Sequence, residues 1–312
     1  MDTSGEPLRV ALCLGIGDCH WVCTKLRGLS AHHGGRAIHA FVNRSPSHLS
    51  IGYLELVPSI AGAFESERAP RDLAHELPPS HRDPRWSTLD GSRGWNGFDY
   101  MLQANGHLET GHHLDTWLPE LATEFSYPLA IPAAARLSAA ALAPAGAILL
   151  YLSGIGPNRH FHNHVCSVGL WVRVVELLND AGWTPVLIGA DTADDRGYRD
   201  AFLDAAGDRV RVSDLVGRTS IAEVCAVIER AGAWVGLNSG TGIVAAMRGT
   251  PTVMLWSDSR YPIPGAIEPL HTNMRTGWLA PPQLAGYRTI SYGSPELTAA
   301  NVVARTLEVV RT

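Results

Sequence analysis

Short apolar runs alternate with helical patterns through the second half of the chain, and this rhythm restricts the fold more than any other feature. The apolar runs cover residues 147–152, 184–188, 234–237 and 251–256. The helical patterns cover residues 167–180, 195–206, 220–231 and 241–248, and the third opens with the capping box S-I-A-E. Strands that alternate with helices at this spacing form a parallel sheet covered on both faces. The sequence therefore predicts a doubly wound α/β fold for this half.

A second set of α/β signals lies near the N-terminus. Residues 9–14 form a continuous apolar run, which is typical of a strand buried on both faces. A helical pattern at 20–31, an apolar run at 37–42 and a further one at 98–104 follow. Residues 66–97 are rich in Pro, Arg, His and Asp, which predicts a loop.

The chain is long enough for two domains, since it has 312 residues. The Ala- and Pro-rich stretch at residues 137–146 indicates the approach to a domain boundary. We expect one Rossmann-like domain over residues 1–143 and a second over residues 144–290. A C-terminal segment, residues 291–312, carries a last helix at 294–310 that could cross back to the first domain.

Composition argues against several classes of protein. No stretch approaches the roughly 20 apolar residues of a membrane-spanning helix, and the acidic, polar N-terminus does not resemble a signal peptide. We therefore expect a cytoplasmic protein. The net charge of −5 and the lack of a basic run disfavour nucleic acid or an anionic membrane as a partner. The five cysteines are scattered without a C-x-x-C pair, which suits a reducing compartment.

A glycine-rich turn, G-L-N-S-G-T-G at residues 236–242, lies between a predicted strand and a predicted helix. Ligands of doubly wound sheets bind beyond the carboxyl ends of the strands, and the N–H groups at a helix start can hold an anion. The same glycines are also compatible with a purely structural turn. No Gly-Lys-Ser/Thr follows, so the turn is not a Walker A loop.

Three segments in a fixed order resemble the family 9 glycosyltransferases, the heptosyltransferases. They are D-L-V-G-R-T-S-I at 214–221, N-S-G at 238–240 and A-A-M-R-G-T-P at 245–251. Gly17-Asp18 and the run Q-A-N-G-H-L-E-T at 103–110 resemble the family's N-terminal motifs. The resemblance spans most of the chain, is strong at residues 184–256 and is thin at residues 44–97.

The resemblance implies a GT-B architecture, in which two Rossmann-like domains face each other across a cleft and the second mainly holds a nucleotide-diphosphate sugar. It implies an inverting, metal-independent transfer to a small-molecule or glycan acceptor, without a further cofactor. Asp18 would be the base that takes the acceptor proton, although it could instead cap the following helix. The expected donor-binding residues are Ser153, Arg159, Gly189, Arg218, Asn238, Ser239, Gly240, Thr241 and Gly242. The expected acceptor-binding residues are Gly17, Asn105 and Glu109.

Departures from the family pattern bear on the substrates. Asn238 stands where the family commonly has Asp, and Ile243 stands where a His usually follows, so the donor need not be an ADP-heptose. The family's donor-phosphate lysine is missing; Lys25 is the only lysine, and Arg159 is the candidate replacement. Glu109 replaces a basic residue, which favours a neutral or cationic acceptor unless it is a solvated surface charge.

Three histidines, His160, His162 and His164, are spaced closely enough to ligate a metal. They could equally contact a phosphate or lie in a surface loop, and we expect no metal.

Other functions remain open. A sugar-nucleotide epimerase of GT-B shape should carry more carboxylates and histidines in the second domain than this sequence does. A transfer-inactive nucleotide-binding protein would be compatible with Asn238 and Ile243. A glycosyltransferase acting on a modified nucleic-acid base is disfavoured by the acidic charge balance.

Overall fold

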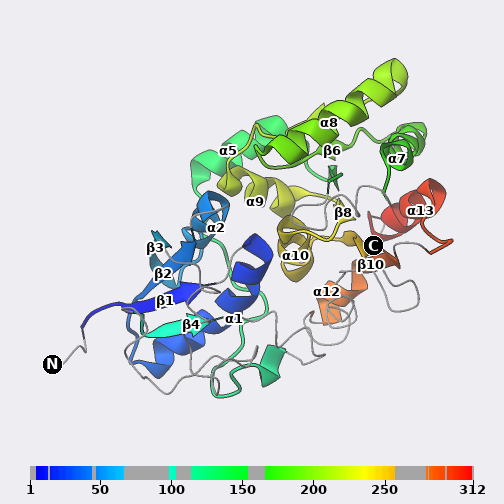
Figure 1. Cartoon of the computed structure of the whole chain (residues 1–312). Helices are drawn as coiled ribbons and strands as arrows, with labels where there is room; N and C mark the ends of the chain where they lie inside the picture. The colour runs from blue at the N-terminus through cyan, green and yellow to red at the C-terminus, as the bar shows by residue number, and fades with distance from the viewer. Residues whose placement is uncertain are drawn as a thin grey trace. The chain divides into compact units, whose positions relative to one another are not determined.

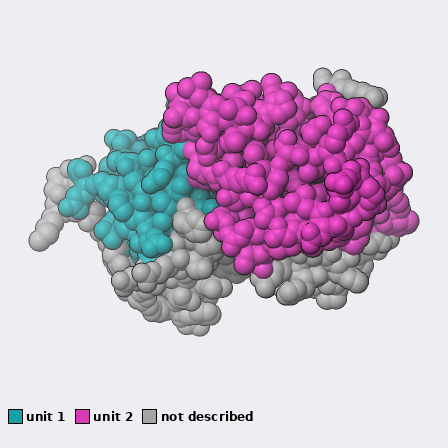
Figure 2. Space-filling view, turned by 90° about the horizontal axis from the view of Figure 1, so that it is seen from above, with its two compact units in different colours: residues 1–130, 276–278 teal, residues 131–275, 279–312 magenta. Residues whose placement is uncertain are grey.

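The structure, a computed structural model, describes residues 5–12, 15–43, 47–66, 98–102, 114–153, 166–256, 279, 281–291 and 294–310. The chain forms two compact units (Figure 2). Unit 1 contains residues 1–130 and 276–278, and unit 2 contains residues 131–275 and 279–312. The two units divide between residues 130 and 131, before helix α5 (Ala133–Leu142). The sequence led us to expect the boundary after this helix, at 143/144.

Unit 1 contains a four-stranded parallel sheet in the order β3-β2-β1-β4. Its strands are β1 (Leu8–Leu12), β2 (Ile38–Asn43), β3 (Ile60–Ser66) and β4 (Tyr100–Leu102). Helices α1 (Ile16–His32) and α2 (Ser47–Leu54) pack against it. The predicted strands at 9–14, 37–42 and 98–104 are confirmed as β1, β2 and β4, whereas α2 and β3 had not been predicted.

Helix α1 begins earlier than its apolar pattern indicated. Its N-cap is Gly15, which has φ 91°, a backbone angle that glycine adopts readily and other residues do not. Gly15 has no side chain with which to cap the helix start. The alternative that Asp18 is the helix cap is therefore wrong, because Asp18 lies inside the first turn.

Unit 2 contains a six-stranded sheet in the order β10-β9-β8-β5-β6-β7, and all of its pairings are parallel. Its strands are β5 (Ile148–Tyr151), β6 (Val186–Leu187), β7 (Ser213–Asp214), β8 (Ala233–Leu237), β9 (Thr252–Trp256) and β10 (Tyr287–Ser291). Every residue of β5, β8 and β9 is buried, which confirms the prediction of a sheet covered on both faces.

Helices cover this sheet on two sides (Figure 1). On one side of the sheet, its strands form a hydrophobic core with α7 (Val168–Asp180), α8 (Ala193–Ala206) and α13 (Ala299–Val310). The remaining helices are α5, α9 (Ile221–Arg230), α10 (Gly240–Met247) and the short α12 (Pro281–Ala285). The predicted capping box of α9 is present, with Ser220 and Glu223 bonded reciprocally.

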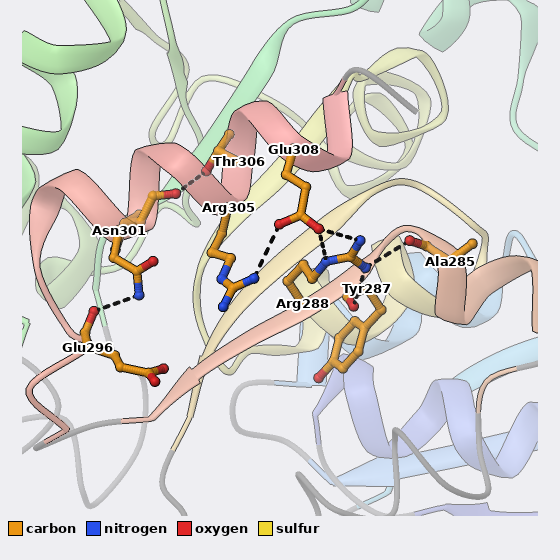
Figure 3. A network of polar contacts seen from close by, with 9 residues as sticks. Ala285, Tyr287, Arg288, Glu296, Asn301, Arg305, Thr306 and Glu308 are labelled. Carbon is orange, nitrogen blue, oxygen red and sulfur yellow. Dashed lines mark hydrogen bonds and ion pairs between the residues drawn. The ribbon is translucent and has the colours of Figure 1, made fainter.

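The C-terminal helix α13 belongs to unit 2, where it contacts α7 and strands β8, β9 and β10. Arg288 of β10 donates from Nε and Nη2 to Glu308 Oε1 of this helix, at 3.0 and 2.8 Å (Figure 3). Glu308 Oε2 accepts a further bond from Arg305 at 3.3 Å. Of the helices in the described ranges, none is both long and apolar enough to cross a bilayer.

Candidate functional site

The strand order of unit 2 defines where a ligand is expected to bind. From β5 the chain adds β6 and β7 on one side, and then returns to add β8, β9 and β10 on the other. The switch point of this doubly wound sheet is therefore the pair β5 and β8. Open α/β sheets bind ligands beyond the carboxyl ends of the strands at such a point.

Two of the predicted donor-binding segments meet at this switch point. Tyr151 of β5 pairs with Gly236 of β8. Ser153 and Asn238 lie the same number of residues beyond that pair, so the structure brings the predicted serine and the predicted glycine-rich turn to neighbouring strand ends.

The turn after β8 ends in the N-terminus of α10. Ser239 is the N-cap, and its Oγ accepts the Gly242 N–H at 3.3 Å and lies 3.0 Å from Thr241 Oγ1. The N–H groups of Gly240 and Thr241 donate to no residue that the structure describes. These two donors, with the positive end of the helix dipole, are what a helix start offers to an anion.

Two glycines of the turn are required by packing. A Cβ on Gly242 would lie 2.6 Å from Cη2 of Trp234 and 2.9 Å from Cε of Met254. A Cβ on Gly236 would lie 2.4 Å from the Tyr151 carbonyl oxygen. The Gly242 N–H is already bonded to Ser239, so Gly242 shapes the turn. The N–H groups that have no partner among the described residues are those of Gly240 and Thr241.

Ser153 is buried, and its hydroxyl proton is already used. Its Oγ donates to Oδ1 of Asp195 in the first turn of α8. Oδ2 of the same carboxylate accepts the Ala190 N–H at 2.7 Å. Burial raises the pKa of Asp195, while the hydrogen bonds from Ser153 and Ala190 partly oppose this shift.

Sequence reasoning did not include Asp195 in the site. The available signal was the spacing of Thr192 and Asp195, a helix start in which the threonine Oγ1 accepts the Asp195 N–H at 3.1 Å.

Gly189 and Arg218 lie on the β6–β7 side of the switch point. Gly189 follows β6, and its carbonyl accepts the Gly217 N–H at 3.1 Å. Arg218 follows β7, its side chain is 64% exposed, and it pairs loosely with Asp214 at 3.6 Å. Asp214 also accepts a bond from Arg199 at 3.2 Å, and Arg199 is paired with Asp200 at 2.7 Å as well. Arg218 is therefore the more exposed and more loosely held of the two arginines beside Asp214.

Other predicted residues are described only in part or not at all. Gly17 is buried in the first turn of α1, and Asp18 follows it there, although the Asp18 side chain is outside the description. The remaining predicted residues, Arg159, Asn105, Glu109, His160, His162 and His164, lie outside the described residues.

Lys25, the only lysine, has a structural environment. It is fully buried in unit 1 and donates to the carbonyls of Leu118 at 3.3 Å and Leu121 at 3.0 Å. Burial lowers its pKa, and the charges of Asp115 and Glu120 oppose that shift.

No metal or redox centre is built from the described residues. Among them, no three His, Cys, Asp or Glu side chains are grouped to hold a metal ion. Cys19, Cys23, Cys166 and Cys225 are buried, and none of them forms a disulfide. Burial raises the pKa of Cys166 far above its ordinary value and that of Cys225 to about 12, so both stay protonated near neutral pH.

Comparison with known proteins agrees with this geometry. The family model "Glycosyltransferase family 9 (heptosyltransferase)" matches residues 168–285, from α7 to α12. No curated protein sequence matches the chain.

Solved structures match over nearly the whole chain. The ADP-heptose lps heptosyltransferase II of E. coli is 16% identical with a TM-score of 0.62, and 98% of each chain is covered. The E. coli heptosyltransferase WaaC with ADP is 13% identical with a TM-score of 0.56, and 97% of this chain and 98% of that one are covered. A family 9 glycosyl transferase from Veillonella parvula DSM 2008 is 12% identical with a TM-score of 0.56, and 93% of this chain and 87% of that one are covered. The chain thus has the GT-B fold of the heptosyltransferases, and its resemblance to glycosyltransferase family 9 is confirmed over residues 168–285.

Proposed function

We propose that the protein is an inverting glycosyltransferase that moves a sugar from a nucleoside-diphosphate donor to a hydroxyl group of a small-molecule or glycan acceptor. The observation that carries the proposal is the switch point of unit 2. There, the N–H groups of Gly240 and Thr241 at a helix start donate to none of the described residues, and they lie within the segment that matches the glycosyltransferase family. A diphosphate is the anion that such a helix start would hold.

The donor site would extend from this turn toward β7. Adjacent strands lie about 4.8 Å apart, so Ser153 after β5 and Arg218 after β7 are separated by roughly 10 Å across the sheet. A nucleotide sugar can span that distance. We expect Arg159 to supply the cation for the diphosphate, as a guanidinium can pair with two phosphate oxygens.

The departures at Asn238 and Ile243 support a donor that differs from the donor named for the E. coli relatives. An amide in place of a carboxylate can donate as well as accept hydrogen bonds, and isoleucine offers no polar contact. We therefore infer that the sugar or its phosphate contacts differ from those of an ADP-heptose.

Asp18 would act as the general base. In unit 1 the chain extends from β1 to β2 and β3 on one side and places β4 on the other, so the switch point is the pair β1 and β4. Asp18 follows β1 at that point. In an inverting transfer the acceptor oxygen attacks the anomeric carbon, the bond to the diphosphate breaks, and the base removes the hydroxyl proton. We propose that the diphosphate charge is neutralised by N–H groups and arginine, without a metal.

The buried cysteines that form no disulfide would suit the cytoplasm as the site of this reaction. With Glu109 in place of a basic residue, we expect a neutral or cationic acceptor.

A thermal-shift screen tests the proposal. ADP, UDP, GDP, CDP and dTDP are each added to the full chain, with adenosine and uridine as controls that lack the diphosphate. At about ten times its Kd, a bound nucleotide should raise the melting temperature by roughly 2–4 °C. Hydrolysis of the matching nucleotide sugars then follows for any nucleotide that binds. If no diphosphate shifts the melting temperature at millimolar concentration, the glycosyltransferase function is refuted.

A further inference from the structure

Asp195 is a buried carboxylate at the edge of unit 2 where the donor is proposed to bind. Asp195 is 3% exposed, and it takes part in none of the ion pairs between described residues. A charged group removed from water without a cationic partner opposes folding unless hydrogen bonds compensate. Such groups are concentrated at functional sites.

Groups from two neighbouring strand ends converge on this carboxylate. Ser153, after β5, donates its hydroxyl proton to Oδ1, and Ala190, after β6, donates its N–H to Oδ2. The Tyr151 hydroxyl has no hydrogen-bond partner of regular geometry among the described residues, although Asp195 and Ser153 are close enough to influence its pKa. The carboxylate therefore joins the ends of β5 and β6 to the start of α8.

The same buried layer continues beneath the glycine-rich turn. The Tyr151 ring stacks on Trp234, with ring centroids 6.3 Å apart and an interplanar angle of 22°. The Trp234 ring lies directly below Gly242, where a Cβ would approach it to 2.6 Å. Packed aromatic rings thus connect the Asp195 cluster to the start of α10.

We propose that Asp195 is a positioning residue of the donor site. It fixes Ser153 after β5 and Ala190 after β6, so that the groups at these strand ends keep one arrangement before the donor arrives. This inference rests on the function proposed above. Such pre-organisation raises affinity because less freedom is lost on binding.

The hydrogen-bond polarity of the pair has a further consequence for Ser153. An ionised carboxylate only accepts hydrogen bonds, so Ser153 must give its single proton to Asp195. Ser153 then has only lone pairs to offer, and it can accept from a hydroxyl of the donor but cannot donate to a phosphate. The phosphate contacts would then be made by the N–H groups of Gly240 and Thr241 and by Arg159, as in the function proposed above.

The test compares Asp195→Asn and Asp195→Ala with Asp204→Asn, a control on the exposed side of the same helix. The Kd of ADP is measured by calorimetry on the full chain, with UDP and GDP as further probes, at a temperature where each variant is folded. We expect the Kd of the best-binding nucleotide to rise about tenfold in Asp195→Asn and further in Asp195→Ala. Asn retains one acceptor oxygen, so it should partly rescue binding. The control should bind as the wild type does.

Ser153→Ala is a second route to the same test, because it removes the donor to Oδ1 and creates little strain. It should weaken nucleotide binding in the same direction, and it remains informative if Asp195→Ala does not fold. Hydrogen exchange of the Ala190 amide should become faster in every Asp195 variant.

The outcomes separate this proposal from the proposed function. Earlier melting of the Asp195 variants with an unchanged Kd in the folded protein would show that Asp195 only stabilises the fold, and would overturn the proposal. Tighter nucleotide binding would overturn it too, because it would show that the Asp195 charge opposes the diphosphate. If the wild type binds none of the nucleotides, the proposed function fails and the positioning role fails with it.

Discussion

Asp18 lies inside the first turn of α1, where a carboxylate interacts favourably with the helix dipole, by about 0.3–1 kcal/mol. Asp18→Asn preserves the size of the side chain but removes its basicity. An alcohol is a poor nucleophile until its proton begins to leave, so we expect kcat to fall by roughly 10²–10⁴-fold. Because the helix start is formed by Gly15, the melting temperature should fall only slightly.

Steady-state kinetics with an identified donor, together with thermal melting, check this prediction. Turnover close to that of the wild type would remove Asp18 from the mechanism. Loss of activity accompanied by a much lower melting temperature would assign Asp18 a structural role.

Gly242 has no room for a side chain, because Trp234 and Met254 lie beneath it. Gly242→Ala should lower the free energy of unfolding by about 1–3 kcal/mol, the usual effect of overpacking a core. Gly197→Ala in α8 is the matched control, since a Cβ there meets nothing within 4 Å. That control should be more stable than the wild type by about 0.5–1 kcal/mol, because alanine is the better helix former. Urea unfolding measures both, and equal stability of Gly242→Ala and the wild type would contradict the packing argument.

At the scale of elements, α13 is joined to β10 by the Arg288–Glu308 pair (Figure 3). The guanidinium of Arg288, assisted by Arg305, holds the pKa of Glu308 below its ordinary value of 4.5. A carboxylate whose pKa is lowered by folding contributes stability above its unfolded-state pKa and loses that contribution as the pH falls through its folded-state pKa.

Glu308→Gln should therefore destabilise the protein at pH 7, and the difference from the wild type should disappear on acidification below about pH 4. High salt should also reduce the difference, because the pair is exposed to solvent. Glu296→Gln is the control, since the Glu296 side chain forms no ion pair with the residues drawn in Figure 3. Urea unfolding at several pH values measures the effect, and a pH-independent difference would show that the ion pair does not stabilise α13.

At the scale of the whole molecule, we expect turnover to survive exhaustive chelation with EDTA. The diphosphate can be neutralised by N–H groups at the start of α10 and by an arginine, and the sequence contains no Asp-x-Asp motif. Turnover is measured after dialysis against EDTA and again after each divalent metal is restored. Loss of activity that one metal restores would indicate a metal site and would direct attention to His160, His162 and His164.

Local sequence patterns predicted most of the elements because those elements carry their own signals. Strands β5, β8 and β9 are buried on both faces, so each is a continuous apolar run. The capping box marked the start of α9. Strands β3 and β10, which were not predicted, lie at the edges of their sheets and are only partly buried, so neither shows a clear apolar run.

Only the tertiary structure decided the contacts between residues that are distant in the sequence. Strand order determines that the switch point lies between β5 and β8, and local propensity does not specify which strands pair. Gly242 looked like a phosphate-binding glycine, yet the Trp234 ring beneath it explains why no side chain fits. Asp195 looked like an ordinary helix-start residue, and only the fold buries it against Ser153, 42 positions away. The sequence determined the elements through local periodicity, whereas the site depends on long-range packing that no local pattern encodes.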